Sequence, residues 1–137
     1  MGYVTLATPM KRGIKLWLER AEYDWETASV MLKGGRYLYV AFMCQQTVEK
    51  ILKGCIHHKT GQLPPYTHNL IKLTECLDLK FSEVQLDFLA LLTRYYLNTR
   101  YPDYKQRLSS EISMTKAEEI LSKSGEIFQW LKKELKI

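Results

Sequence analysis

The sequence is poor in cysteine and proline, and it has no long apolar run. It has three cysteines, Cys44, Cys55 and Cys76, and an odd number this small does not suit a disulfide framework. Their apolar surroundings predict reduced core thiols in a cytoplasmic protein. No segment approaches the roughly 18 consecutive apolar residues of a membrane-spanning helix. Residues 1–10 lack a basic start ahead of a long apolar segment, so we predict no secretory signal there.

The chain also lacks the alternating apolar and polar pattern of strands. Its hydrophobic residues recur instead at the 3.6-residue period of α-helices. The spacing predicts five helices, at residues of about 11–33, 36–59, 68–79, 83–101 and 113–135, with the longer links at 60–67 and 102–112. Gly34-Gly35 is expected to end the first helix. We therefore predict an all-α, up-and-down helical bundle, with one domain at residues 11–137 and an N-terminal extension at residues 1–10.

The charge of the chain is unbalanced towards the positive side. Of its 137 residues, 20 are Lys or Arg and 15 are Asp or Glu, which gives a net charge of +5. This excess favours an acidic partner, such as a nucleic acid, a nucleotide phosphate or an acidic protein. The cations are spread along the chain and not gathered in one arm, so composition alone does not choose among these partners.

The most distinctive stretch is residues 86–104, an apolar helical run that becomes cationic and rich in tyrosine before Pro102. Its start follows a capping-box pattern, in which the side chains of Ser82 and Gln85 satisfy free backbone amides. Its end is expected at Tyr101, because the residue before a proline is disfavoured in the α conformation.

Within this helix, three polar residues share one stripe, because they recur at intervals of three and four residues: Arg94, Asn98 and Tyr101. Two interpretations remain open. The stripe is a working site at the edge of the core face, or Arg94 pairs with Asp87 or a neighbouring helix while Tyr101 packs at the helix end.

Histidine patterns predict no metal site and no cofactor. His57 and His58 are adjacent, so they point about 100° apart on a helix, and no second ligand cluster accompanies them. His68 follows Thr67, which is expected to cap the short third helix. At that position His68 is either a base or the donor of a local hydrogen bond.

Several motifs resemble the HEPN (higher eukaryotes and prokaryotes nucleotide-binding) family when they are taken in order. They are the segment from Trp17 to Ala28, Gly35-Arg36-Tyr37, the run Gln45-Gln46-Thr47-Val48-Glu49-Lys50, Thr67-His68-Asn69-Leu70 and Thr99-Arg100-Tyr101-Pro102-Asp103. Together they span nearly the whole chain. The resemblance implies a helical bundle that commonly dimerises and, in prokaryotes, a gene neighbour that encodes a minimal nucleotidyltransferase.

Many HEPN relatives are metal-independent ribonuclease toxins with an arginine followed, after four to six residues, by a histidine. Arg94 matches the arginine, but no histidine follows within that spacing, where the chain has Thr99, Arg100 and Tyr101. The group that would transfer the proton is therefore missing, and the sequence leaves enzymatic activity undecided. In some relatives a tyrosine two residues further on is adenylylated by the nucleotidyltransferase. Tyr101 occupies that position here, and a packed phenol at the helix end is the competing interpretation.

The resemblance also implies a cleft for nucleotide or phosphate between the second and fourth helices. Five residues would line it: Lys50, Lys53, Arg94, Asn98 and Arg100. We predict a homodimeric module that binds nucleotide or RNA and acts with a minimal nucleotidyltransferase in a toxin–antitoxin-like pair. Two alternatives stay open. One is a divergent ribonuclease toxin with Arg94 as the catalytic residue and His68 or water moving the proton, and the other is a non-catalytic homodimeric scaffold.

Overall fold

The computed structural model describes the backbone of residues 2–135 and the side chains of residues 11–135. It contains six α-helices: α1 (Gly2–Lys33), α2 (Tyr37–Thr60), α3 (Leu70–Glu75), α4 (Glu83–Asn98), α5 (Pro102–Glu111) and α6 (Met114–Leu135). No strand occurs in this part of the chain. The predicted all-α class is confirmed.

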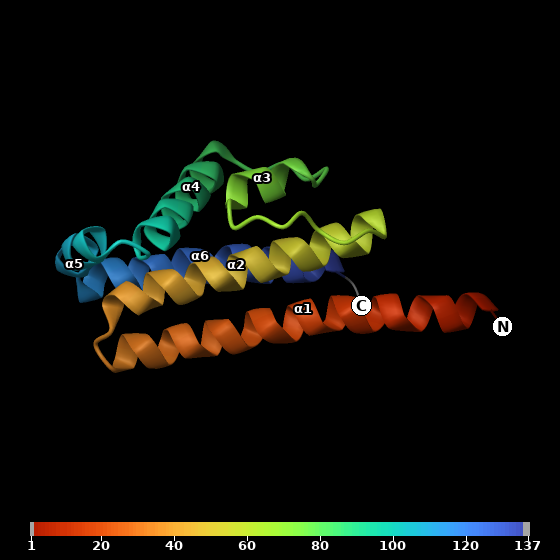
Figure 1. The fold of residues 1–137 in the computed structure, drawn as a ribbon, viewed down its shortest axis with the longest axis horizontal. Helices are drawn as coiled ribbons and strands as arrows, with labels where there is room; N and C mark the ends of the chain where they lie inside the picture. The colour runs from red at the N-terminus through yellow and green to blue at the C-terminus, as the bar shows by residue number, and fades with distance from the viewer. Residues whose placement is uncertain (1, 136–137) are drawn as a thin grey trace.

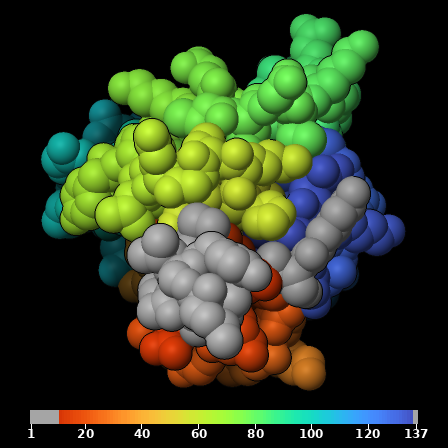
Figure 2. Space-filling view, turned by 90° about the vertical axis from the view of Figure 1, so that its right-hand side faces the viewer, coloured from red at the N-terminus to blue at the C-terminus, as the bar shows by residue number. Residues whose placement is uncertain are grey.

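Helix α2 is the centre of the bundle. It packs against α1, α6, α3 and α4, with α1 on the side opposite α3 and α4 (Figure 1). Seen from the end where α2 finishes, the segment after α2 and helix α3 lie above, α1 lies below and α6 lies to one side (Figure 2). Because all of its faces meet other helices, α2 is buried around most of its circumference, including the polar residues Gln45, Glu49 and Lys53. Across residues 2–135, no helix combines the length and apolarity needed to cross a membrane.

The turn between α1 and α2 follows the prediction from Gly34-Gly35. Gly35 has a φ of 74°, the left-handed conformation that glycine adopts without strain. The amide of Arg36 donates to the carbonyl of Met31 at 2.8 Å, which caps the end of α1. The two long helices therefore run antiparallel through a tight connection.

The capping box of α4 is also confirmed. The Gln85 amide donates to Ser82 Oγ at 3.0 Å, and the Ser82 amide donates to Gln85 Oε1 at 2.8 Å. The expected cap of the third helix is wrong by two residues. Asn69 caps α3 by accepting from the amide of Ile71, whereas Thr67 Oγ1 accepts from the amide of Asn69. A side-chain cap placed directly before the helix satisfies its first free amides, which explains the shift.

The segment after Pro102 corrects the predicted number of helices. It was expected to be a link, but Pro102 is the first residue of α5, and α4 ends earlier than predicted, at Asn98. Proline suits the first helical position, because its fixed φ is helical and its missing amide would have no partner there. The sequence of this helix is polar and lacks an apolar stripe from which a helix could be predicted, since Leu108 is its one buried residue. Helix α1 also starts earlier than expected, at Gly2.

The cysteines differ in their surroundings. Cys44 and Cys55 are buried in the core as predicted, but Cys76 is exposed, which corrects the prediction for that residue. Burial raises the pKa of both core thiols from 9.0 to about 12, because the thiolate would lose its hydration.

We therefore expect a thiol reagent at about pH 8 to modify Cys76 rapidly in the native protein and to leave the two core thiols intact. The Cys76→Ser variant should show no rapid reaction. Above about pH 9 the unfolded chain loses the protons of Cys44 and Cys55 while the folded chain keeps them, so the free energy of unfolding should fall as the pH rises. Denaturant unfolding at increasing pH measures this slope. Rapid labelling of more than one native thiol would contradict the prediction.

Candidate functional site

A surface cavity of about 230 Å³ lies between α4 and α5, and it holds two residues that the sequence singled out, Arg94 and Asn98. These side chains are one helical turn apart on α4, so they project from the same face. The remaining lining residues come from both helices: Leu91 and Tyr95 from α4, and Leu108 and Glu111 from α5. The Arg94–Asn98 cavity therefore depends on the helix that begins at Pro102.

The Arg94–Asn98 cavity carries one cation and one anion. Arg94 is exposed, and no carboxylate of the described residues forms an ion pair with it. Glu111 faces the cavity from α5. Burial raises the pKa of Tyr95, and the charge of Glu111 acts in the same direction while that of Arg94 opposes it. A ligand that has both phosphate and hydroxyl groups matches this arrangement, because the guanidinium donates to the first and the carboxylate accepts from the second.

The ion pair between Arg94 and Asp87, one of the two sequence interpretations, does not form. Asp87 lines a different cavity with Lys123 of α6. Seven residues along an α-helix correspond to about 10 Å, which is longer than either side chain can bridge alone. Among the described residues, Arg94 therefore has no ion-pair partner.

The two lysines of the predicted cleft are engaged inside the bundle. Lys50 Nζ pairs with Asp24 of α1. Lys53 Nζ pairs with Glu49 at 3.1 Å, and the two side chains are only 8% and 6% exposed. The Arg94–Asn98 cavity is lined by neither lysine. The structure thus places them between helices and not beside Arg94.

Arg100 and Tyr101 lie at the junction of α4 and α5. Arg100 Nη2 donates to the hydroxyl of Tyr96 at 3.2 Å, and this hydrogen bond is the main cause of the raised pKa of Arg100. Tyr101 is 60% exposed, and its ring meets that of Tyr104 edge to face at 6.2 Å. Its hydroxyl is accordingly accessible, in contrast to a phenol buried at a helix end.

A polar network around Glu49 went unnoticed in the sequence. The buried carboxylate of Glu49 accepts from Gln45 Nε2 at 3.1 Å and from Lys53 Nζ at 3.1 Å, and its Oε1 lies 2.8 Å from His68 Nδ1. Gln45 Nε2 also donates to the backbone carbonyl of His68 at 3.0 Å. The i, i+4 spacing of the three α2 residues was the available signal. The network joins the segment before α3 to α2. The side chain of His68 therefore contacts a residue 19 positions away in the sequence, which is not the local hydrogen bond that was one of its two interpretations.

Comparison with known proteins agrees with this architecture. A family model described as the HEPN domain matches residues 14–135. The chain belongs to the HEPN family.

Two solved structures resemble this HEPN domain over most of its length. TT1696 from Thermus thermophilus is 28% identical, with a TM-score of 0.76, and the match covers 89% of this chain and 98% of that one. ST0689, an archaeal HEPN homologue, is 25% identical, with a TM-score of 0.71, and the match covers 89% and 97% of the two chains. No curated protein matches the chain.

This HEPN domain departs from the ribonuclease motif at Thr99, as its sequence indicated. Thr99 Oγ1 donates to the carbonyl of Tyr96 at 2.6 Å, so its hydroxyl is used at the end of α4. His68 contacts Glu49 and lies outside the set of residues that line the Arg94–Asn98 cavity. Within the described residues, no group of three His, Cys, Asp or Glu side chains is placed to hold a metal ion.

Proposed function

We propose that this HEPN protein binds a nucleotide or an RNA phosphate through Arg94 and Asn98. The observation that carries the proposal is an exposed guanidinium that no described carboxylate neutralises, beside an amide in a cavity. Arginine suits this role because its planar fork donates two parallel hydrogen bonds to phosphate. Glu111 accepts from a sugar hydroxyl in the same cavity.

The same proposal includes the setting in which the module acts. We place it in the cytoplasm as a homodimer, paired with a minimal nucleotidyltransferase in a toxin–antitoxin-like system. Family membership supports this setting, and the exposed hydroxyl of Tyr101 supports a modification by such a partner. When the purified protein is incubated with the nucleotidyltransferase and ATP, we expect one adenylyl group on the hydroxyl oxygen of Tyr101 in the wild type, with pyrophosphate released from ATP, and none on Tyr101→Phe. Size-exclusion chromatography with light scattering should give twice the 16.1 kDa of one chain at about micromolar concentration.

Isothermal titration of ATP and of a short RNA tests the binding site. We expect Arg94→Ala to weaken binding about tenfold to a hundredfold, because hydrogen bonds to a charged group contribute about 1.5–3 kcal/mol. Arg12→Ala removes the same charge from an exposed position on α1 and serves as the matched control. Equal affinities of the two variants would contradict the proposed site. The absence of heat with every nucleotide and RNA would remove the binding function altogether.

A divergent ribonuclease that uses Arg94 is the alternative within the same family. It needs a proton-transferring group near Arg94, and the cavity offers Glu111 and Tyr95 in place of an imidazole. Binding therefore comes first in our proposal. RNA that is cut by the purified protein in the presence of a chelator, but left intact by Arg94→Ala, would reverse this order.

A further inference from the structure

Helix α5 contributes little to the core and presents most of its surface to solvent. Leu108 is its one buried residue, whereas Tyr101 and Tyr104 are 60% and 47% exposed. It lies at the end of the bundle where α1 turns into α2 (Figure 1). Packing against the core alone therefore does not explain why this segment forms a helix.

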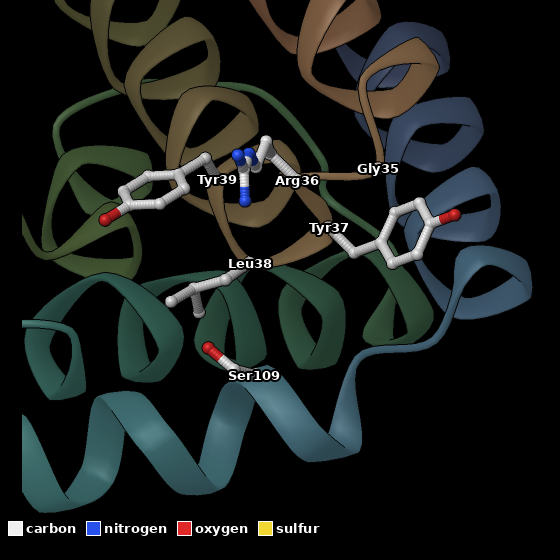
Figure 3. Close-up of a pocket in the computed structure, with 6 residues that line it drawn as sticks. All are labelled: Gly35, Arg36, Tyr37, Leu38, Tyr39 and Ser109. Atoms are coloured by element: carbon white, nitrogen blue, oxygen red, sulfur yellow. The ribbon is translucent and has the colours of Figure 1, made fainter.

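The start of α2 extends this exposed surface. A second cavity, of about 210 Å³, is formed by residues 35–39 together with Ser109 of α5. In it the side chains of Arg36 and Tyr39 lie next to each other, Tyr37 extends to the opposite side, and Leu38 lies between Arg36 and Ser109 in this view (Figure 3). Arg36 is exposed, and its guanidinium forms no ion pair with any described carboxylate.

Cations and tyrosine rings alternate across the two helices. Lys105 Nζ lies 5.1 Å from the centre of the Tyr39 ring, which joins α5 to the start of α2. The guanidinium carbon of Arg107 lies 5.4 Å from the centre of the Tyr104 ring. Each cation holds its ring in place by a cation–π contact, while the exposed remainder of the ring stays free for stacking.

We define the tyrosine–cation surface by six residues: Arg36, Tyr39, Tyr101, Tyr104, Lys105 and Arg107. Among the described residues, none of its three cations forms an ion pair. Two carboxylates lie on α5, Asp103 and Glu111, and Glu111 lines the Arg94–Asn98 cavity. The surface therefore keeps a net positive charge beside exposed aromatic rings, and this combination is typical of proteins that bind single strands by stacking bases and attracting phosphates.

The position of α5 connects this surface to the Arg94–Asn98 cavity. Ser109 of α5 lines the cavity at the start of α2, and Leu108 and Glu111 line the cavity at Arg94. The two cavities thus border the same helix. Glu111 favours ribose over deoxyribose, because its carboxylate accepts a hydrogen bond from a 2′-hydroxyl, which deoxyribose lacks.

We propose that the tyrosine–cation surface binds single-stranded RNA, with bases stacked on Tyr39, Tyr101 and Tyr104 and the strand crossing α5 towards Arg94. The proposal rests on the proposed phosphate-binding function of Arg94 and adds the path of the strand. The tyrosines contribute to a strand of several nucleotides and contribute nothing to a single nucleotide held at Arg94.

Fluorescence anisotropy with a labelled, unstructured oligouridylate of about 12 nucleotides tests this path. We expect Tyr104→Ala and Tyr39→Ala each to raise the Kd about 5- to 100-fold, since base–aromatic stacking is lost. Tyr104→Phe should bind like the wild type, because stacking needs the ring and not the hydroxyl. Tyr23→Ala, which removes a tyrosine that is 67% exposed on α1, is the matched control and should also bind like the wild type. Circular dichroism melts of every variant establish that the fold is kept.

Titration of ATP against the same variants separates this inference from the proposed function. Tyr104→Ala should bind ATP like the wild type, whereas Arg94→Ala should weaken the binding of both ligands. If ATP binds and the oligouridylate does not, or if the tyrosine variants bind RNA unchanged, the inference is overturned and the Arg94 site stands. If RNA binding depends on the tyrosines and not on Arg94, the strand surface stands and the Arg94 site fails.

Two further outcomes would overturn the inference. Equal affinity for oligodeoxythymidylate and oligouridylate would remove the assignment to RNA. Tyrosine variants that keep RNA affinity but lose the homodimer in light scattering would make the surface a protein interface. We expect neither, and we expect the affinity for RNA to fall steeply with salt, with a smaller slope for Arg107→Gln because one phosphate contact is lost.

Discussion

Replacing Glu49 with alanine is expected to lower the free energy of unfolding by about 3–5 kcal/mol. Glu49 is 4% exposed and accepts hydrogen bonds from Gln45 and Lys53 while it contacts His68. Its removal leaves the ammonium group of Lys53, a residue that is 6% exposed, without a partner in the core. The cost of an unpaired buried charge is much larger than the strength of a surface ion pair. Urea denaturation followed by circular dichroism measures the loss.

Two further variants separate the unpaired charge from other effects of the Glu49 substitution. Glu26→Ala removes an exposed carboxylate of α1 and should change the free energy of unfolding by less than about 0.5 kcal/mol. The double variant Glu49→Ala with Lys53→Met should recover most of the loss, because it leaves no buried charge behind. If Glu49→Ala lowered the free energy of unfolding by less than about 1 kcal/mol, the ammonium of Lys53 would have to reach water. The network would then not hold the segment before α3 against α2.

Replacing Phe128 with alanine is expected to cost about 3–5 kcal/mol of unfolding free energy. Phe128 is 1% exposed on α6, and its ring centre lies 6.3 Å from that of Trp25 on α1. Trp25 also packs onto Gly125, where an added Cβ would come within 2.6 Å of the indole. The removal of Phe128 therefore opens a cavity in a close contact of two helices that cannot collapse freely.

Tyr66→Ala is the matched control for the loss of an aromatic ring, because Tyr66 is 98% exposed. It should change the free energy of unfolding by less than about 0.5 kcal/mol. The measurement is urea denaturation followed by circular dichroism, since the fluorescence of Trp25 itself changes when Phe128 is removed. Similar losses for the two variants would mean that the contact between α1 and α6 does not hold the bundle together.

The polar residues of this HEPN domain fall into two groups, those that form ion pairs inside the bundle and those that lie at its surface. Lys50 and Lys53 form ion pairs with Asp24 and Glu49 inside the bundle, where a ligand would have to break existing contacts to reach them. Arg94 stands at the surface of the α4–α5 junction without such a partner among the described residues. The two predictions above therefore concern stability, and the Arg94 and tyrosine variants concern binding.

Local signals in the sequence determined the helical bundle and several of its boundaries. The 3.6-residue spacing of apolar side chains marks the buried stripes of the long helices, because a stripe at that period faces one side. Gly35 and the Ser82–Gln85 box act on backbone groups within a few residues, so their effects on a turn and a cap can be predicted without neighbours. The motifs of the HEPN family can also be recognised in the sequence, because each consists of residues that are close together in the chain.

Only the tertiary structure decided which charges are neutralised and which remain available. Asp24 and Lys50 are 26 residues apart and meet because α1 and α2 pack in one particular rotation. Helix α5 was invisible to periodicity, since a helix that buries a single leucine has no apolar stripe, yet it builds one wall of the Arg94–Asn98 cavity. The sequence by itself determined which side of each long helix is apolar. The packing of the helices determined which residues of a neighbouring helix face that side, because the packing depends on contacts between residues far apart in the chain.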